Sequence, residues 1–184
     1  AADLVAIGTT ELLLYEQIVT GFVPFTSISA LATLDSLSFA TPLFAGMSGV
    51  GNADTQGHVA QRTSVLRDFQ GLNGAGIRVG VISDSFDNGG AGAAATDIGT
   101  GDLPGTGNPN GFLTPINVVR DNDPGIDEGR AMLQIVHDVA PAAQLSFANV
   151  ANAFGQKSQL GMADNIRSLA ADDDPADPAA DIIV

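Results

Sequence analysis

The pattern of hydrophobic and polar positions between residues 60 and 184 predicts an alternation of strands and helices. The clearest strand covers residues 77–82, where β-branched residues dominate and glycines precede the run, as in a buried strand. Further strands are predicted at residues 114–119, 144–148 and 181–184. The helical spacing of apolar residues predicts helices at residues 58–69, 127–140 and 158–170.

This order of elements indicates βαβ units and therefore the α/β class. Right-handed crossovers would place parallel strands in one sheet with helices on both faces, a three-layer arrangement. Such sheets bind ligands beyond the carboxyl ends of their strands. Asp84, which follows the strand at residues 77–82, lies at such an end.

The helix at residues 127–140 carries the most informative polar residues. Its first turn contains the acids Asp127 and Glu128, which suit the helix dipole, and the helix ends before Pro141. Its apolar residues at core spacing are Met132, Ile135, Val136 and Val139. We therefore expect Glu128 near the N-terminus of a helix, on the side of Met132 and Ile135.

The first 45 residues differ in composition from the rest and predict a small α+β unit. Residues 12–14 and 18–24 are strand candidates, and apolar residues at every third position from Ile28 to Leu37 predict one face of a helix. Further on, residues 89–111 read as a long polar loop without a packed element. The chain therefore divides into a unit at residues 1–45, a linker at 46–60 and a main domain at 61–184.

Composition narrows the possible partners. The 184 residues are 45% hydrophobic, which is ample for a packed core. With 21 acids against 7 bases and a net charge of -14, the surface should repel nucleic acid and anionic membrane, so we expect neither as a partner. Cysteine is absent, which excludes disulfides, thiolate zinc sites and a cysteine nucleophile.

The same features bear on localisation. No run of 18 apolar residues predicts a transmembrane helix, and the first residues lack the basic start of a secretory signal. Acidity and the lack of cysteine fit either secretion or a salty environment. We expect a secreted protein, although no signal is visible in this sequence.

Three motifs in order resemble the subtilisin-like fold: residues 79–87, the helix that begins with Glu128-Gly129-Arg130, and residues 139–147. Subtilisins have His-Gly-Thr where this chain has Glu-Gly-Arg, and the sedolisin (serine-carboxyl peptidase) branch is known for a glutamate there. The chain therefore resembles sedolisins more closely, over roughly residues 60–184. The resemblance implies a serine-type endopeptidase that acts on protein or peptide substrates, with Asp84 and Glu128 in its triad and activity shifted to acid pH.

The resemblance has two departures. Sedolisins usually carry a second acid four residues after the glutamate, and Met132 stands there, so Asp84 would orient the base as in subtilisins. The Gly-Thr-Ser type turn of the nucleophile lies far downstream in both families and is missing here. We therefore expect an N-terminal portion of a longer enzyme that is inactive by itself, and any calcium site of the sedolisin kind would belong to the later part. Residues 1–45 resemble the last half of the propeptide that precedes many subtilisin-like domains, which assists folding and blocks the cleft; an ordinary N-terminal subdomain is the alternative.

Other assignments remain open for each of these residues. Asp84 is also a typical turn acid, and Ser83 and Asp87 compete with it for the alignment. Asp127 is the nearest rival to Glu128. His137 lies nine residues after Glu128, on the opposite face of the helix, and we expect a surface or helix-end histidine.

Other kinds of site are less well supported. His58 precedes residues 61–184, which carry the peptidase-like motifs, and is therefore a weak candidate for a catalytic residue. Several loop residues have oxygen atoms that could bind calcium, but their spacing matches no EF-hand, so we expect them to be solvated loop residues and not calcium ligands. These residues are Asp97, Asp102, Asn108, Asn110, Asp121 and Asp123. A dinucleotide fold would need its glycines after the strand, whereas Gly74 and Gly76 precede it. A non-catalytic binding or surface module on the same scaffold is the alternative function.

Overall fold

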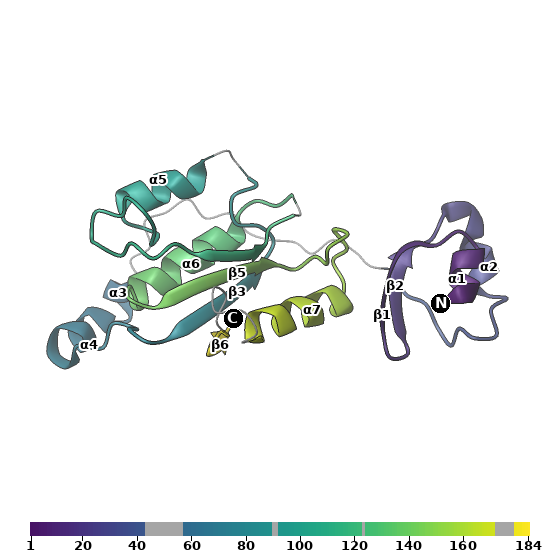
Figure 1. Ribbon diagram of the computed structural model, residues 1–184, viewed down its shortest axis with the longest axis horizontal. Helices are drawn as coiled ribbons and strands as arrows, with labels where there is room; N and C mark the ends of the chain where they lie inside the picture. Colours follow the sequence, from purple (N-terminus) through teal and green to yellow (C-terminus); the bar gives the residue numbers. More distant parts are fainter. Residues whose placement is uncertain (43–56, 90–91, 123, 172–178) are drawn as a thin grey trace.

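The structure is a computed structural model that describes residues 1–42, 57–89, 92–122, 124–171 and 179–184. Figure 1 shows a small N-terminal unit beside a larger α/β domain. Most of the predicted linker at residues 46–60 lies outside the described residues. The mixed α/β class and the flanked parallel sheet are confirmed.

The α/β domain is built on a four-stranded parallel sheet with the order β4-β5-β3-β6. The strands are β3 (Arg78–Ser83), β4 (Asn117–Arg120), β5 (Gln144–Asn149) and β6 (Ile182–Ile183). All four lie within three residues of the predicted positions. Numbered from β3, the spatial order is 2-3-1-4, which differs from the 3-2-1-4 start of a dinucleotide-binding sheet.

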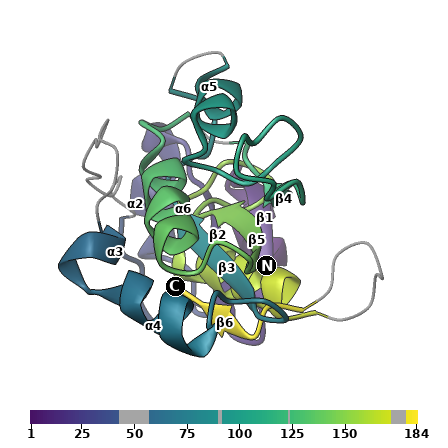
Figure 2. The same ribbon diagram turned by 90° about the vertical axis from the view of Figure 1, so that its left-hand side faces the viewer.

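Two helices cover opposite faces of this sheet (Figures 1 and 2). Helix α6 (Glu128–Val139) packs its buried Leu133 into the core cluster that contains Val81 and Phe147. Helix α7 (Gln159–Ala170) lies on the other face, where a Cβ on Gly80 would meet the Leu169 side chain at 3.1 Å. The three-layer prediction therefore holds for the region around β3 and β5.

The expectation of right-handed crossovers is wrong for α6. Two connections lead across the sheet toward the β6 edge: one runs from β4 through α6 to β5, and the other from β5 through α7 to β6. They lie on opposite faces of the sheet. The connection from β3 to β4 runs the other way on the α6 face, since its Ala94 and Leu103 join the α6-side core. The α6 crossover therefore has the opposite hand to the other two. Because about 98% of such connections are right-handed, α6 makes the left-handed one.

Residues 89–111 were predicted to lack a packed element, and this is also wrong. Helix α5 (Ala93–Thr100) forms there, with Ala94 buried, and Leu103 is fully buried after it. Alanine and glycine dominate the segment, so its hydrophobic signal is weak. The few apolar side chains that it does have are the ones that pack against the core.

Two helix predictions need adjustment. The helix predicted at residues 58–69 is two helices, α3 (Gly57–Ala60) and α4 (Thr63–Gln70), because Arg62 adopts the left-handed conformation between them. In α6, Leu133 is the fully buried apolar residue, whereas Ile135, predicted at a core position, is 45% exposed.

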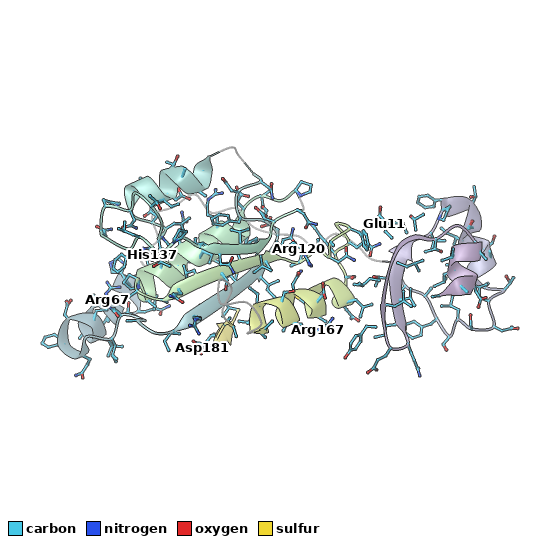
Figure 3. The ribbon with its side chains drawn as sticks, viewed as in Figure 1. Glu11, Arg67, Arg120, His137, Arg167 and Asp181 are labelled. Carbon is cyan, nitrogen blue, oxygen red and sulfur yellow. The ribbon has the colours of Figure 1, made fainter. Side chains whose placement is uncertain are left out.

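The N-terminal unit contains an antiparallel pair of strands and short helices. Its elements are α1 (Ala2–Ala6), β1 (Thr10–Tyr15), β2 (Ile18–Phe22), the 3₁₀ helix η1 (Phe25–Ser27) and α2 (Ile28–Leu31). The helix predicted from Ile28 to Leu37 therefore ends early. The unit contacts the α7 side of the main domain, where Arg167 lies 5.0 Å from the centre of the Tyr15 ring and the Gln156 amide donates to the Glu11 carbonyl (Figure 3).

Among the residues that the structure describes, no helix combines the length and the apolar character needed to cross a lipid bilayer.

The close packing of α6 on the sheet can be tested at Gly129. A Cβ there would lie 2.7 Å from the Ser85 carbonyl oxygen and against the Phe147 ring, so Gly129→Ala should destabilise the chain by about 1–3 kcal/mol. Gly99 in α5 has no heavy atom within 4 Å of such a Cβ, so Gly99→Ala should stabilise by about 0.5–1 kcal/mol. Urea unfolding of both variants measures the difference, and equal effects would show that α6 does not pack this closely.

Candidate functional site

Asp84 follows β3 directly and binds the start of α6. Its side chain is only 6% exposed, and it accepts backbone hydrogen bonds from Ile126 at 2.7 Å and from Glu128 at 2.9 Å. The Ser85 N–H donates to the same carboxylate at 2.6 Å. Amides at the start of a helix lack partners within the helix and carry the positive end of its dipole, so a carboxylate is stabilised there. Asp84 therefore joins the carboxyl edge of the sheet to the N-terminus of α6.

Glu128 is the first residue of α6, and its side chain is half-buried at the same edge. The Ser83 hydroxyl, on the last residue of β3, donates to Glu128 Oε2 at 3.1 Å. The structure thus brings the Asp84 carboxylate to the backbone N–H of Glu128. The side chain that contacts the Glu128 carboxylate here is that of Ser83, the rival of Asp84 for the alignment.

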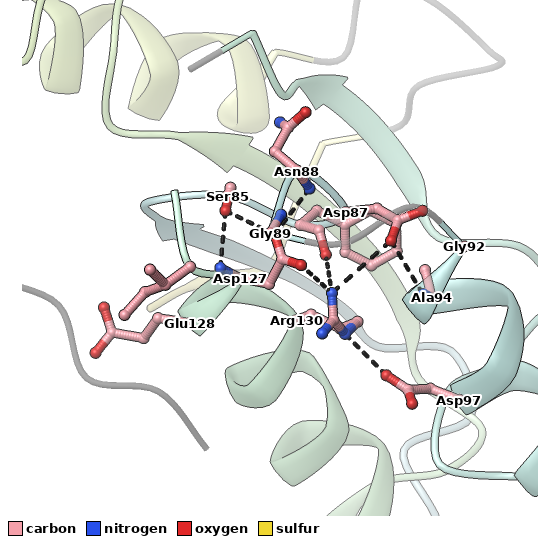
Figure 4. Close-up of polar contacts among 12 residues, drawn as sticks. Ser85, Asp87, Asn88, Gly89, Gly92, Ala94, Asp97, Asp127, Glu128 and Arg130 are labelled. Carbon is pink, nitrogen blue, oxygen red and sulfur yellow. Dashed lines mark hydrogen bonds and ion pairs between the residues drawn. The ribbon is translucent and has the colours of Figure 1, made fainter. Parts of the chain in front are cut away.

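Asp127, the rival to Glu128, binds the loop that follows β3, at Asn88 and Gly89 (Figure 4). It is 4% exposed and has a left-handed backbone with φ 62°. Its Oδ1 accepts from the Ser85 hydroxyl at 2.7 Å and from the backbone of Asn88 and Gly89, each at 2.8 Å, while its Oδ2 pairs with Arg130. Asp127 therefore has a structural role.

The pKa of Asp127 follows from these contacts. Burial alone would raise the pKa of this carboxyl group. The hydrogen bonds from Ser85 and Arg130, together with the backbone N–H groups, outweigh burial and hold the pKa below its ordinary 3.8. The ionised form of Asp127 is therefore the one that the folded chain prefers.

Arg130, which the sequence did not single out for a role, links α6 to α5. Its guanidinium pairs with Asp127, its Nε lies 2.8 Å from Asp97 Oδ2, and it donates to the Phe86 carbonyl at 2.9 Å (Figure 4). Burial raises the pKa of Asp97, and Arg130 works against that shift. A signal was available, because an arginine one turn into a helix, beside first-turn acids, is well placed for an i, i+3 pair.

The loop acids considered as calcium ligands make protein contacts instead. Asp121 accepts from the backbone of Phe86 at 3.0 Å and of Asp87 at 3.1 Å, and Asp102 accepts from the Thr100 hydroxyl at 2.6 Å. Asp123 lies outside the described residues. Among the residues that are described, no three His, Cys, Asp or Glu side chains are grouped to hold a metal ion.

Both histidines lie away from this edge, at the other end of α6. His137 is in the last turn, as predicted, but it is 3% exposed and not a surface residue. Burial lowers its pKa, against the opposing charge of Asp102, and the ring packs edge-on against Phe112. With His58 it lines a cavity of about 380 Å³. Nine residues of helix correspond to roughly 14 Å, so neither histidine shares a site with Glu128.

No family model and no curated protein matches this chain. The geometry at the end of β3 is therefore the basis for assigning a function.

The ionised Asp127–Arg130 pair predicts a pH-dependent contribution to stability. Since the folded pKa of Asp127 is lowered, its contribution is complete well above pH 4 and is lost as the pH falls through the folded value. Asp127→Asn should therefore destabilise the chain at pH 7 by about 3 kcal/mol, and by less at pH 3, which is below the ordinary pKa of 3.8. Urea unfolding at both pH values measures this.

The control for this experiment is Asp68→Asn, which removes an exposed carboxylate on α4. It should change stability by less than about 0.5 kcal/mol at either pH. An Asp127→Asn penalty that stayed the same from pH 7 to pH 3 would show that the charge pair is not its source.

Proposed function

We propose that this chain is part of a serine-type endopeptidase in which Glu128 acts as the general base and Asp84 holds it in place. The observation that carries the proposal is the hydrogen bond from the Glu128 amide to the Asp84 carboxylate at the carboxyl edge of a parallel sheet. Ligands of such sheets bind at this edge. The motif resemblance to sedolisins supplies the reaction class.

The proposed reaction begins with a serine hydroxyl that attacks a peptide carbonyl while Glu128 accepts its proton. Glu128 then returns the proton to the departing amine, which leaves an acyl-enzyme, and water repeats the cycle to release the second product. In the proposal, the serine and the oxyanion donors are not among these 184 residues. The substrate would be a protein or peptide.

A carboxylate base suits work at acid pH. A free glutamate side chain titrates near pH 4.3, against about 6.5 for a histidine, so a carboxylate remains able to accept a proton in conditions where an imidazole is already charged. This difference between the two types of side chain supports the acid-shifted activity that the sedolisin resemblance implies.

The N-terminal unit fits the propeptide part of the proposal. Its hairpin contacts the side of the domain that carries α7, through the Tyr15–Arg167 and Glu11–Gln156 pairs. In the proposal, this unit is the chain's own partner during folding, and the mature enzyme works outside the cell.

The decisive test is Glu128→Gln in the longer protein, with a protein substrate at pH 3 to 6 and mass spectrometry of the products. Loss of the general base should lower kcat by about 10²- to 10⁴-fold. Asp68→Asn, on exposed α4, should leave kcat within about two-fold of the wild type. Hydrolysis that persists in Glu128→Gln would contradict the proposal, and a wild-type protein without peptidase activity would favour a binding module.

A further inference from the structure

The Ser83 side chain has a fixed position at the edge where Asp84 and Glu128 meet. It is the last residue of β3, it pairs in register with Asn149 of β5, and it is 6% exposed. Its carbonyl oxygen accepts from the Val150 N–H at 2.7 Å, which fixes the backbone on one side. A residue held in this way presents its hydroxyl in a narrow range of directions.

That hydroxyl donates to Glu128 Oε2 at 3.1 Å. An ionised carboxylate only accepts hydrogen bonds, so the direction of this bond is fixed as long as Glu128 is charged. Hydrogen bonds to charged groups are roughly twice as strong as those between neutral groups. The bond therefore favours one orientation of the Glu128 carboxylate.

Ser83 and Asp84 reach different parts of Glu128. Asp84 binds backbone N–H groups at residues 126 and 128, and so fixes where the helix starts. Ser83 reaches the carboxylate, which is the group that would transfer the proton. Productive proton transfer requires groups held within about 0.5 Å, and a half-buried glutamate has several rotamers to choose from.

We infer that Ser83 is a positioning residue, which holds the Glu128 carboxylate in the orientation needed for proton transfer. This inference rests on the proposed function. It gives the residue before Asp84 a part in the reaction without contact with the substrate. Asp84 accepts from the Glu128 N–H and Asp127 precedes Glu128 in the chain, and both are kept in the experiment below.

The experiment compares Ser83→Thr with Ser83→Val in the longer protein. Threonine and valine have nearly the same shape, and only threonine keeps the hydroxyl. Ser83→Val should lower the profile of kcat between pH 3 and pH 6 about ten-fold, with KM within two-fold, because the hydroxyl that orients the Glu128 carboxylate is lost. Ser83→Thr should keep the wild-type profile.

The control is Ser146→Ala, which removes a buried hydroxyl from the neighbouring strand β5 and should leave the profile unchanged. Thermal unfolding confirms that each variant is folded. If Ser83→Val and Ser83→Thr share the wild-type profile while Glu128→Gln is inactive, the inference is wrong and the proposed function stands. If Glu128→Gln is active, the proposed function fails and the inference fails with it.

Discussion

The carboxylate of Asp84, bound to the first amides of α6, is the interaction on which the site depends. It joins the end of β3 to the start of a helix that lies more than 40 residues later in the chain. A buried carboxylate needs compensation, and unpaired helix amides need acceptors, so each satisfies the other. The left-handed crossover adds to this constraint, because it sets the face of the sheet on which α6 lies.

Charge compensation explains how an acidic chain buries acids next to one another. Asp84 receives backbone amides, whereas Asp127 receives amides, a hydroxyl and the Arg130 guanidinium. Asp127 does so in a left-handed conformation, which is uncommon for a residue other than glycine. The loop contacts of Asp127 hold that conformation, and Glu128 follows it directly. The position of the proposed base is thus set by Asp84, at the end of β3, and by Asp127, at the start of α6.

The sequence predicted the strands, because buried β-branched runs are a local pattern. It also predicted Asp84 at the end of β3, where the contact in the structure runs from the Glu128 backbone N–H to the Asp84 carboxylate. It did not predict α5, since alanine and glycine give little hydrophobic periodicity. The pair that Arg130 makes with Asp97 was also missed, because the partner on α5 depends on how two distant segments pack. The hand of the α6 crossover does not follow from any local sequence pattern. The general preference for right-handed connections predicted the wrong hand for it.

The most direct test of the account is a crystal structure of the complete proposed peptidase with a peptide aldehyde, which would form a hemiacetal with its catalytic serine. The account predicts that the Glu128 carboxylate lies within hydrogen-bond distance of that serine oxygen, with Asp84 still bound to the Glu128 amide. An aldehyde bound covalently at a serine far from Glu128, or one that forms no covalent bond, would contradict it.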